Sequence, residues 1–161
     1  DAATMIFENP LEGVDRVKIA ADYALTDNVE NLALLGTGDF IASGNASVNI
    51  ITGNRGANQI LGLEGNDILK GGRGDDMLTG GSDADTFIFN HHSDVDTITD
   101  FNQAEHDRIQ LKGWTNIESF KDLSGHISNE GGNAVIDFGD ADVLVISGVD
   151  AGALKEGDFL F

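Results

Sequence analysis

The chain has 161 residues and a mass of 17.0 kDa, which is the length of one ordinary domain. Its 9 lysines and arginines against 28 aspartates and glutamates give a net charge of −19, which excludes an electrostatic hold on nucleic acid or an anionic membrane and indicates bound cations. The lack of cysteine excludes disulfides, thiolate metal sites and cysteine nucleophiles, and no apolar run reaches the roughly 18 residues of a membrane span.

Residues 1–43 contain two strand-like stretches, an apolar one at 5–7 and one at 14–21 in which Val17, Ile19 and Ala21 alternate with other residues. We expect this part to form an N-terminal coil or cap. The chain starts at Asp1 rather than at a methionine, and no signal-peptide pattern follows. We therefore expect it to be a segment of a longer protein.

From residue 44 the sequence repeats every nine residues without a slip. The frames read GNASVNIIT, GNRGANQIL, GLEGNDILK, GGRGDDMLT and GGSDADTFI. The first position is always glycine, the sixth is asparagine or aspartate, and the eighth is a large apolar residue. A fixed short period of this kind is the signature of a repeat architecture in which each unit contacts its neighbours.

The chemistry of one unit follows from its residue types. Glycine tolerates left-handed backbone conformations, so the loop can turn its carbonyl oxygens toward one point, and the sixth residue adds a side-chain oxygen. Positions seven to nine form a short strand with one large side chain facing inward. Two units complete one coil of eighteen residues, so loops two units apart stack, and a hard divalent cation with six to eight oxygen ligands fits between them.

These units resemble the calcium-binding nonapeptide G-G-x-G-x-D-x-U-x of the RTX (repeats-in-toxin) family. The unit at 71–79 matches every fixed position, and the unit at 62–70 lacks only the second glycine. The segments GGSDADTFIF, DTITDF and DRIQL resemble the exit from such repeats in secreted proteases and epimerase R-modules, and 27–45 resembles their lead-in. The resemblance implies an all-β fold, a right-handed parallel β-roll that is a calcium-binding solenoid with a C-terminal β-rich cap.

The resemblance also implies about four interloop Ca²⁺ sites, in which positions one, three and six of one loop face positions two, four and six of the loop two units later. The first consists of Gly53, Arg55, Asn58, Gly72, Gly74 and Asp76, and the second of Gly62, Glu64, Asp67, Gly81, Asp83 and Asp85. The third consists of Gly44, Ala46, Asn49, Leu63, Gly65 and Asp67, and the fourth of Gly71, Arg73, Asp76 and Asp100. Most ligands at positions one to four are backbone carbonyls, so arginine is compatible with those positions.

Beyond the repeats, residues 90–161 predict a cap that covers the open apolar end of the roll. We expect a short helix over 116–124 with Asn116 as its N-cap, and two adjacent strands at 134–138 and 143–146 that follow a turn at 130–133. The chain thus divides into an N-terminal coil or cap (1–43), the nonapeptide repeats (44–89) and a C-terminal cap (90–161).

The last five residues, 157–161, combine one acidic residue with an apolar end. They resemble the uncleaved C-terminal signal of proteins secreted by type I (ABC-transporter) systems. The alternative interpretation is a last strand that docks on the cap.

No catalytic centre is evident, and we predict that the chain is not an enzyme. His91 and His92 could ligate a transition metal, but an exposed pair after a strand is more typical of a surface. The run 105–107 fits a turn better than a catalytic group, and Trp114 and Tyr23 fit a core better than a sugar platform. The sequence shows neither an HExxH motif nor a serine nucleophile with a histidine partner.

The leading hypothesis is a non-catalytic calcium-binding module, secreted to the outside or surface of a bacterium, that folds on extracellular calcium. Its expected partners are an upstream domain of a longer chain and the type I secretion machinery. One alternative is an R-module that binds an alginate-like polysaccharide for a secreted polysaccharide-modifying enzyme. Against it, nine cationic residues spread through the chain make a poor groove for a polyanion. A second alternative is the terminus of an adhesin or surface-layer protein.

Overall fold

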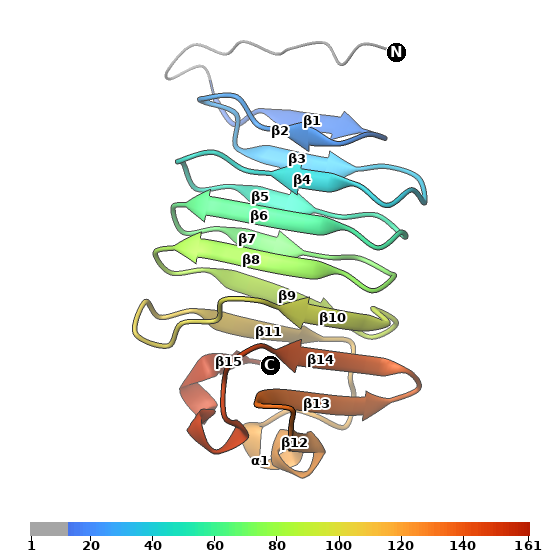
Figure 1. Cartoon of the computed structure of the whole chain (residues 1–161), viewed down its shortest axis with the longest axis vertical. Coiled ribbons are helices and arrows are strands. Elements are labelled where there is room, and N and C mark those ends of the chain that lie inside the picture. Colours follow the sequence, from blue (N-terminus) through green and yellow to red (C-terminus); the bar gives the residue numbers. More distant parts are fainter. Residues whose placement is uncertain (1–12) are drawn as a thin grey trace.

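Two sheets face each other across a narrow interior in the computed structural model, which describes residues 13–161 (Figure 1). The first sheet consists, in spatial order, of β1 (Arg16–Ile19), β3 (Asn31–Leu34), β5 (Ile50–Thr52), β7 (Ile68–Lys70), β9 (Thr86–Asn90), β11 (Arg108–Lys112) and β15 (Phe159–Leu160). The second consists of β2 (Tyr23–Ala24), β4 (Ile41–Ser43), β6 (Gln59–Glu64), β8 (Met77–Ser82), β10 (Val95–Ile98), β14 (Asp142–Ile146), β13 (Asn133–Gly139) and β12 (Ile127–Glu130).

From β1 to β11, successive strands alternate between the two sheets, and the chain winds as a right-handed coil (Figure 1). Within the repeats each strand pairs in parallel with the strand one coil later, as Ile51 does with Leu69 and Ile60 with Leu78. Hydrogen bonds between these coils join residues 18 positions apart. The prediction of an all-β parallel β-roll with eighteen residues per coil is confirmed.

The eighth residue of every unit builds the interior. These side chains are at most 2% exposed and stack in two columns, and they are Ile51, Ile60, Leu69, Leu78 and Phe87. Burying one such side chain contributes roughly 1.5–3 kcal/mol. A strand of three residues is too short to be stable alone, so the stacked columns hold the coils together.

Parallel pairing extends beyond the nonapeptides in both directions. β1 to β4 add coils on the N-terminal side, and β10, β11, β14 and β15 continue the two sheets on the C-terminal side. Both sheets therefore run through residues 43/44 and 89/90. The three-part division stays a prediction about where the motif begins and ends, and the expected strand at 5–7 lies outside the described residues.

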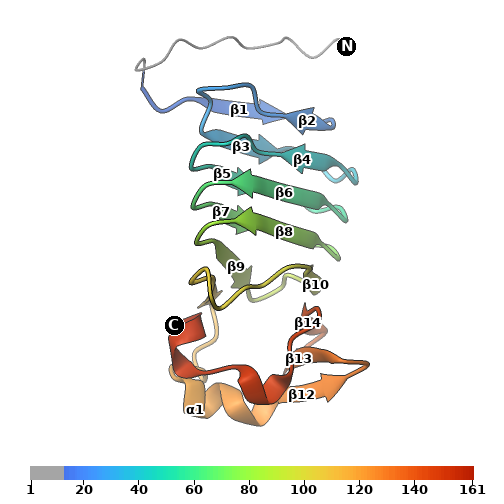
Figure 2. The same ribbon diagram turned by 60° about the vertical axis from the view of Figure 1, so that its left-hand side comes forward.

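The C-terminal segment closes the end of the roll (Figure 2). The expected strands at 134–138 and 143–146 are confirmed as β13 and β14, an antiparallel pair, and the expected turn at 130–133 joins β12 to β13. The predicted helix is shorter than expected: α1 spans Phe120–Leu123 and continues as a 3-10 turn, Ser124–His126. Its N-cap is Ser119 rather than Asn116, because the Ser119 side chain accepts the Asp122 amide at 3.3 Å.

The extreme C-terminus forms a strand. Phe159 and Leu160 pair in parallel with Ile109 and Gln110 of β11, and Phe159 is buried. The docked last strand, one of the two interpretations of residues 157–161, describes Phe159 and Leu160, which follow a 3-10 turn at Glu156–Asp158.

Candidate metal centres

The loops that join the two sheets stack along two edges of the roll. The loops at 44–49, 62–67, 80–85 and 99–107 lie along one side, which we call edge one, and those at 53–58, 71–76 and 91–96 lie along the other, edge two (Figure 1). Each edge is therefore a column of similar loops one coil apart. Neighbouring strands in a sheet lie about 4.8 Å apart, so oxygen atoms of successive loops can share one ion.

A ladder of carboxylates runs along edge one. The backbone N–H of Asn49 donates to Asp67 Oδ1 at 2.7 Å, that of Asp67 to Asp85 Oδ1 at 2.9 Å, and that of Asp85 to Asp107 Oδ1 at 2.9 Å. Each bond joins the sixth position of one loop to the carboxylate of the next. The ladder fixes the orientation of every carboxylate and occupies one of its oxygens.

Edge two carries the same ladder. The N–H of Asn58 donates to Asp76 Oδ1 at 2.7 Å, and the N–H of Asp76 donates to Asp96 Oδ1 at 3.1 Å. Both edges thus have the same hydrogen-bond pattern, in which the N–H group of the sixth residue of one loop donates to the carboxylate at the equivalent position of the next loop.

The second oxygen of four of these carboxylates has no protein partner. Within residues 13–161, four buried side-chain oxygens lack a hydrogen bond, and they are Oδ2 of Asp67, Asp76, Asp85 and Asp96. Burial raises the pKa of the first three carboxyls to about 7 and that of Asp96 to about 8, and neighbouring carboxylates add to the rise. A buried anionic oxygen without a partner is costly, and a bound cation removes that cost.

The glycines bring the backbone oxygens up to these carboxylates. A Cβ on Gly62 would collide with the Asp67 carboxylate and with the carbonyl oxygen of Gly80, one coil later. Gly81 has a φ of +107°, and a Cβ there would collide with the carbonyl oxygen of Leu63. The close approach therefore requires glycine. The resulting donor set of carboxylate and carbonyl oxygens is the hard, all-oxygen set that Ca²⁺ prefers.

The structure brings the residues of each of the first three predicted sites onto two consecutive loops of the same edge. The loop 53–58 stacks on 71–76, 44–49 on 62–67, and 62–67 on 80–85. Two of these residues, Asp83 and Leu63, have structural features that the motif does not predict. Asp83 Oδ2 accepts the N–H of Gly65 at 3.2 Å, and Leu63 takes the second-glycine position with a φ of +88°.

The structure does not bring Asp100 to the other residues of the fourth predicted site. This residue lies on edge one, where its carboxylate accepts the N–H groups of Gly80 at 2.9 Å and Gly81 at 2.8 Å. The coil that ends at β10 has 20 residues instead of 18, so counting in nines fails there. The residue that faces Asp76 is Asp96. The signal that could have identified it is the alignment of Ile98 with Leu78 as the inward-facing residue.

We call the space between two stacked loops of one edge a gap. Two gaps on the N-terminal side contain asparagine amides. Asn45 Nδ2 donates to the carbonyl oxygens of Thr26 at 2.8 Å and Val29 at 2.9 Å on edge one. Asn54 Nδ2 donates to those of Leu35 at 3.1 Å and Gly38 at 3.0 Å on edge two. Both asparagines occupy the second position of their unit. Their amide hydrogens satisfy these four carbonyl oxygens, and an amide side chain stands where the last two units have glycine.

Two of the other sequence candidates, the run 105–107 and Trp114, make contacts within the fold. Residues 102–107 form a turn in which Asp107 accepts the N–H groups of Asp85 and Asn102, and burial raises the pKa of the Asp107 carboxyl. Trp114 stacks on both Phe89 and Phe138, with ring centroids 5.4 and 4.4 Å away, and those two rings also contact each other at 5.2 Å. Both groups therefore contribute hydrogen bonds or packing within the fold.

Comparison with known proteins agrees with this geometry. The family model of the RTX calcium-binding nonapeptide repeat matches in four copies over residues 43–78 and 52–87. Among solved structures, the chain resembles the R3 module of the mannuronan C5-epimerase AlgE6 from Azotobacter vinelandii, with 24% identity, a TM-score of 0.54, and coverage of 99% of this chain and 86% of that one. This likeness concerns the fold. No curated protein is significantly similar to the chain, and within residues 13–161 no helix has the length and apolarity to cross a membrane.

Proposed function

We propose that this chain, which carries RTX calcium-binding nonapeptide repeats on a parallel β-roll, binds about four Ca²⁺ ions between its stacked loops and folds on them outside the cell. The observation that carries this proposal is the set of four buried carboxylate oxygens without a partner, on Asp67, Asp76, Asp85 and Asp96. Each belongs to a ladder that holds it in place. The module itself is non-catalytic.

The energetics indicate that calcium binding controls folding of the chain. An ion that binds only the folded chain stabilises it by RT ln(1 + [Ca²⁺]/Kd), about 2.7 kcal/mol per site at a hundredfold excess. Four such sites contribute on the order of 11 kcal/mol, which is comparable to the whole stability of a domain, about 5–15 kcal/mol. Four ions would also change the net charge from −19 to −11 and reduce self-repulsion.

The calcium affinity expected for such sites determines where the module folds. Extracellular calcium modules have dissociation constants on the order of 10⁻⁴–10⁻³ M, far above the calcium level of a cytosol. The module would stay unfolded in a producing bacterium, leave through a type I secretion system as part of a larger chain, and fold on arrival. Its place is then extracellular or on the cell surface.

Calcium titration of the chelated chain tests this proposal. Circular dichroism should change from a largely unordered to a β-rich spectrum as calcium is added, and a spectrum that does not change would refute the switch. Asp76→Asn should reduce the number of bound ions by one. Asp75→Asn is the matched control, because it removes the same charge from an exposed neighbour and keeps an acceptor for the Val95 N–H.

A second candidate function is binding of an acidic, alginate-like polysaccharide, as part of a polysaccharide-modifying enzyme. A groove along edge two favours it, because three of the nine cationic side chains line this groove, Arg55, Lys70 and Arg73, with His91 and His92 at one end. These three side chains gather on one edge, which supports the proposal against the expectation that the cationic residues are too scattered for a polyanion. Arg55 and Arg73 hold the same position on loops one coil apart, so their charges form a row along the roll.

Titration of alginate oligomers in the presence of calcium tests the second candidate. Arg55→Gln and Arg73→Gln should each weaken binding, whereas Arg108→Gln, on β11 outside the groove, should leave it unchanged. The absence of binding to the unmodified chain would exclude this candidate and leave the calcium switch standing.

A further inference from the structure

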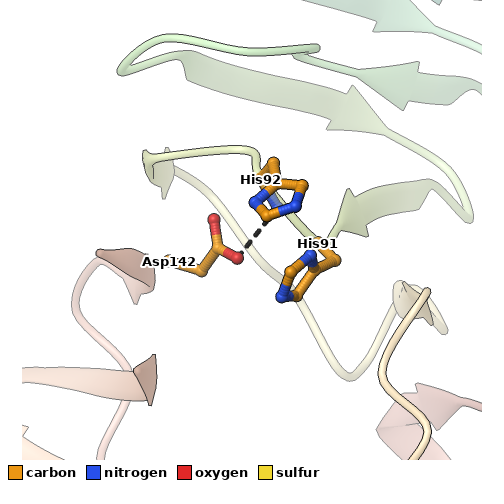
Figure 3. A group of neighbouring side chains, drawn as sticks. All are labelled: His91, His92 and Asp142. Carbon is orange, nitrogen blue, oxygen red and sulfur yellow. Dashed lines mark hydrogen bonds between the residues drawn. The ribbon is translucent and has the colours of Figure 1, made fainter. Parts of the chain in front are cut away.

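We propose that His91, His92 and Asp142 form a binding site for a transition-metal ion such as Zn²⁺. This site is separate from the calcium gaps, the spaces between stacked loops that contain Asp67, Asp76, Asp85 and Asp96. Each side chain offers one ligand atom, and the three atoms all lie within 4.8 Å of one another (Figure 3). The two imidazole rings are adjacent, with centroids 3.8 Å apart and planes inclined by 64°. The site lies where the C-terminal hairpin meets the last loop of edge two.

Two consecutive histidines face the same space only because the backbone turns sharply between them. In an extended strand, successive side chains point to opposite faces. Here β9 ends at Asn90, and His92 adopts a φ of +66°, a left-handed conformation that is uncommon outside glycine. This turn brings the second ring back beside the first. His91 is also held from behind, because its ring packs edge-on against Trp114 at 6.0 Å.

Asp142 is a preformed third ligand. It begins β14 and is 1% exposed, and its two oxygens accept the backbone N–H groups of His92 at 2.8 Å and Asp94 at 3.1 Å. The bond to His92 spans 50 residues of sequence. Hydrogen bonds of this kind orient a metal-binding carboxylate and leave further lone pairs on each oxygen for an ion.

The donor set distinguishes this site from the calcium gaps. Two imidazole nitrogens and one carboxylate oxygen suit Zn²⁺, Ni²⁺ or Cu²⁺, whereas Ca²⁺ prefers oxygen ligands alone. Three protein ligands with water in the fourth position give a tetrahedral zinc site. The surrounding hollow also contains Arg73, whose charge is offset by Asp94 and Asp140.

A metal at this point would join two distant parts of the chain. His91 and His92 belong to the loop between β9 and β10, and Asp142 belongs to the β13–β14 hairpin. An ion held by all three ties the closing hairpin to the roll. The site would thus stabilise the C-terminal end of the roll, beside the β10–β14 pairing.

Calorimetric titration of the whole chain with ZnCl₂ in excess calcium tests this inference. We expect one zinc ion per chain, with affinity at least about tenfold weaker in His91→Ala and His92→Ala. His106→Ala and His126→Ala serve as controls, because these histidines lie outside the cluster, and they should keep full affinity. Asp142→Asn should behave like the first pair.

Two results would overturn the proposal. They are the absence of a zinc site in the unmodified chain and zinc binding that both single histidine variants retain. Loss of that retained binding in Asp76→Asn would place the zinc in a calcium site. None of them bears on the calcium switch, which is read from calcium titration alone.

Discussion

The asparagine-filled gaps permit a test that separates structural coils from calcium-dependent ones. The Asn54 side chain is 9% exposed, donates to two carbonyl oxygens of the preceding loop and accepts the Gly56 N–H at 2.7 Å. Asn54→Ala removes all three bonds. A net contribution of about 0.5–1.5 kcal/mol per bond predicts a loss of about 2–4 kcal/mol in the free energy of unfolding.

Urea unfolding at several calcium concentrations is the appropriate assay. When sites are saturated, each bound ion adds RT ln[Ca²⁺] to stability, so the slope of unfolding free energy against ln[Ca²⁺] counts the ions. Asn54→Ala should lower the line at every calcium concentration without changing its slope. Asp76→Asn, by contrast, should reduce the slope by one ion.

The matched control is Asn66→Ala. Asn66 is exposed and accepts a single N–H, from Ala84 at 2.9 Å, so its removal should cost only about 0.5–1 kcal/mol. A slope that falls by one ion in Asn54→Ala would refute the reasoning, because it would mean that the gap beside Asn54 holds calcium.

Three further predictions follow from the same loops. First, the pKa values of the buried carboxyls on Asp67, Asp76, Asp85 and Asp96 are raised to about 7 to 8, from about 3.8 for an ordinary aspartate, so their protonation stabilises the folded chain. Without calcium, this stabilisation is complete below about pH 4 and is lost as the pH rises to about 7–8. The chelated chain should therefore gain β-structure by circular dichroism between pH 7 and pH 5, and an unordered chain at pH 5 would contradict this. Second, equilibrium dialysis should show one ion fewer for Asp96→Asn and an unchanged number for Asp100→Asn; the reverse would restore the sequence-based assignment. Third, Gly62→Ala should lower the free energy of unfolding by about 1–3 kcal/mol in calcium-saturated thermal unfolding, because the added methyl group collides with a carboxylate and a carbonyl. In the control Gly125→Ala, the methyl group meets no atom within 4 Å, and the stability should not change. Equal effects of the two substitutions would argue against the tight loop.

The sequence predicts the fold well where a strict period operates. A nine-residue repeat determines both which side chain faces inward, as Leu69 does, and which carboxylate joins the ladder, as Asp67 does. Both follow from local geometry that every coil repeats.

Prediction fails where the coil length changes or where contacts are distant in sequence. Asp96 was missed because its coil has two extra residues, which moved the assignment to Asp100. The meeting of His92 with Asp142 has no periodic signal, since it depends on how a hairpin 50 residues away closes the roll. The role of Asn54 also required the structure, because only the stacked loops show which carbonyls its amide reaches.

A crystal structure of the chain grown in millimolar calcium tests the central claim most directly. The account predicts an ion beside the free oxygen of Asp67, Asp76, Asp85 and Asp96, at the 2.3–2.6 Å typical of Ca²⁺–oxygen bonds, with backbone carbonyls of two successive loops completing each shell. Water alone in these gaps, or carboxylates turned out to solvent, would contradict it.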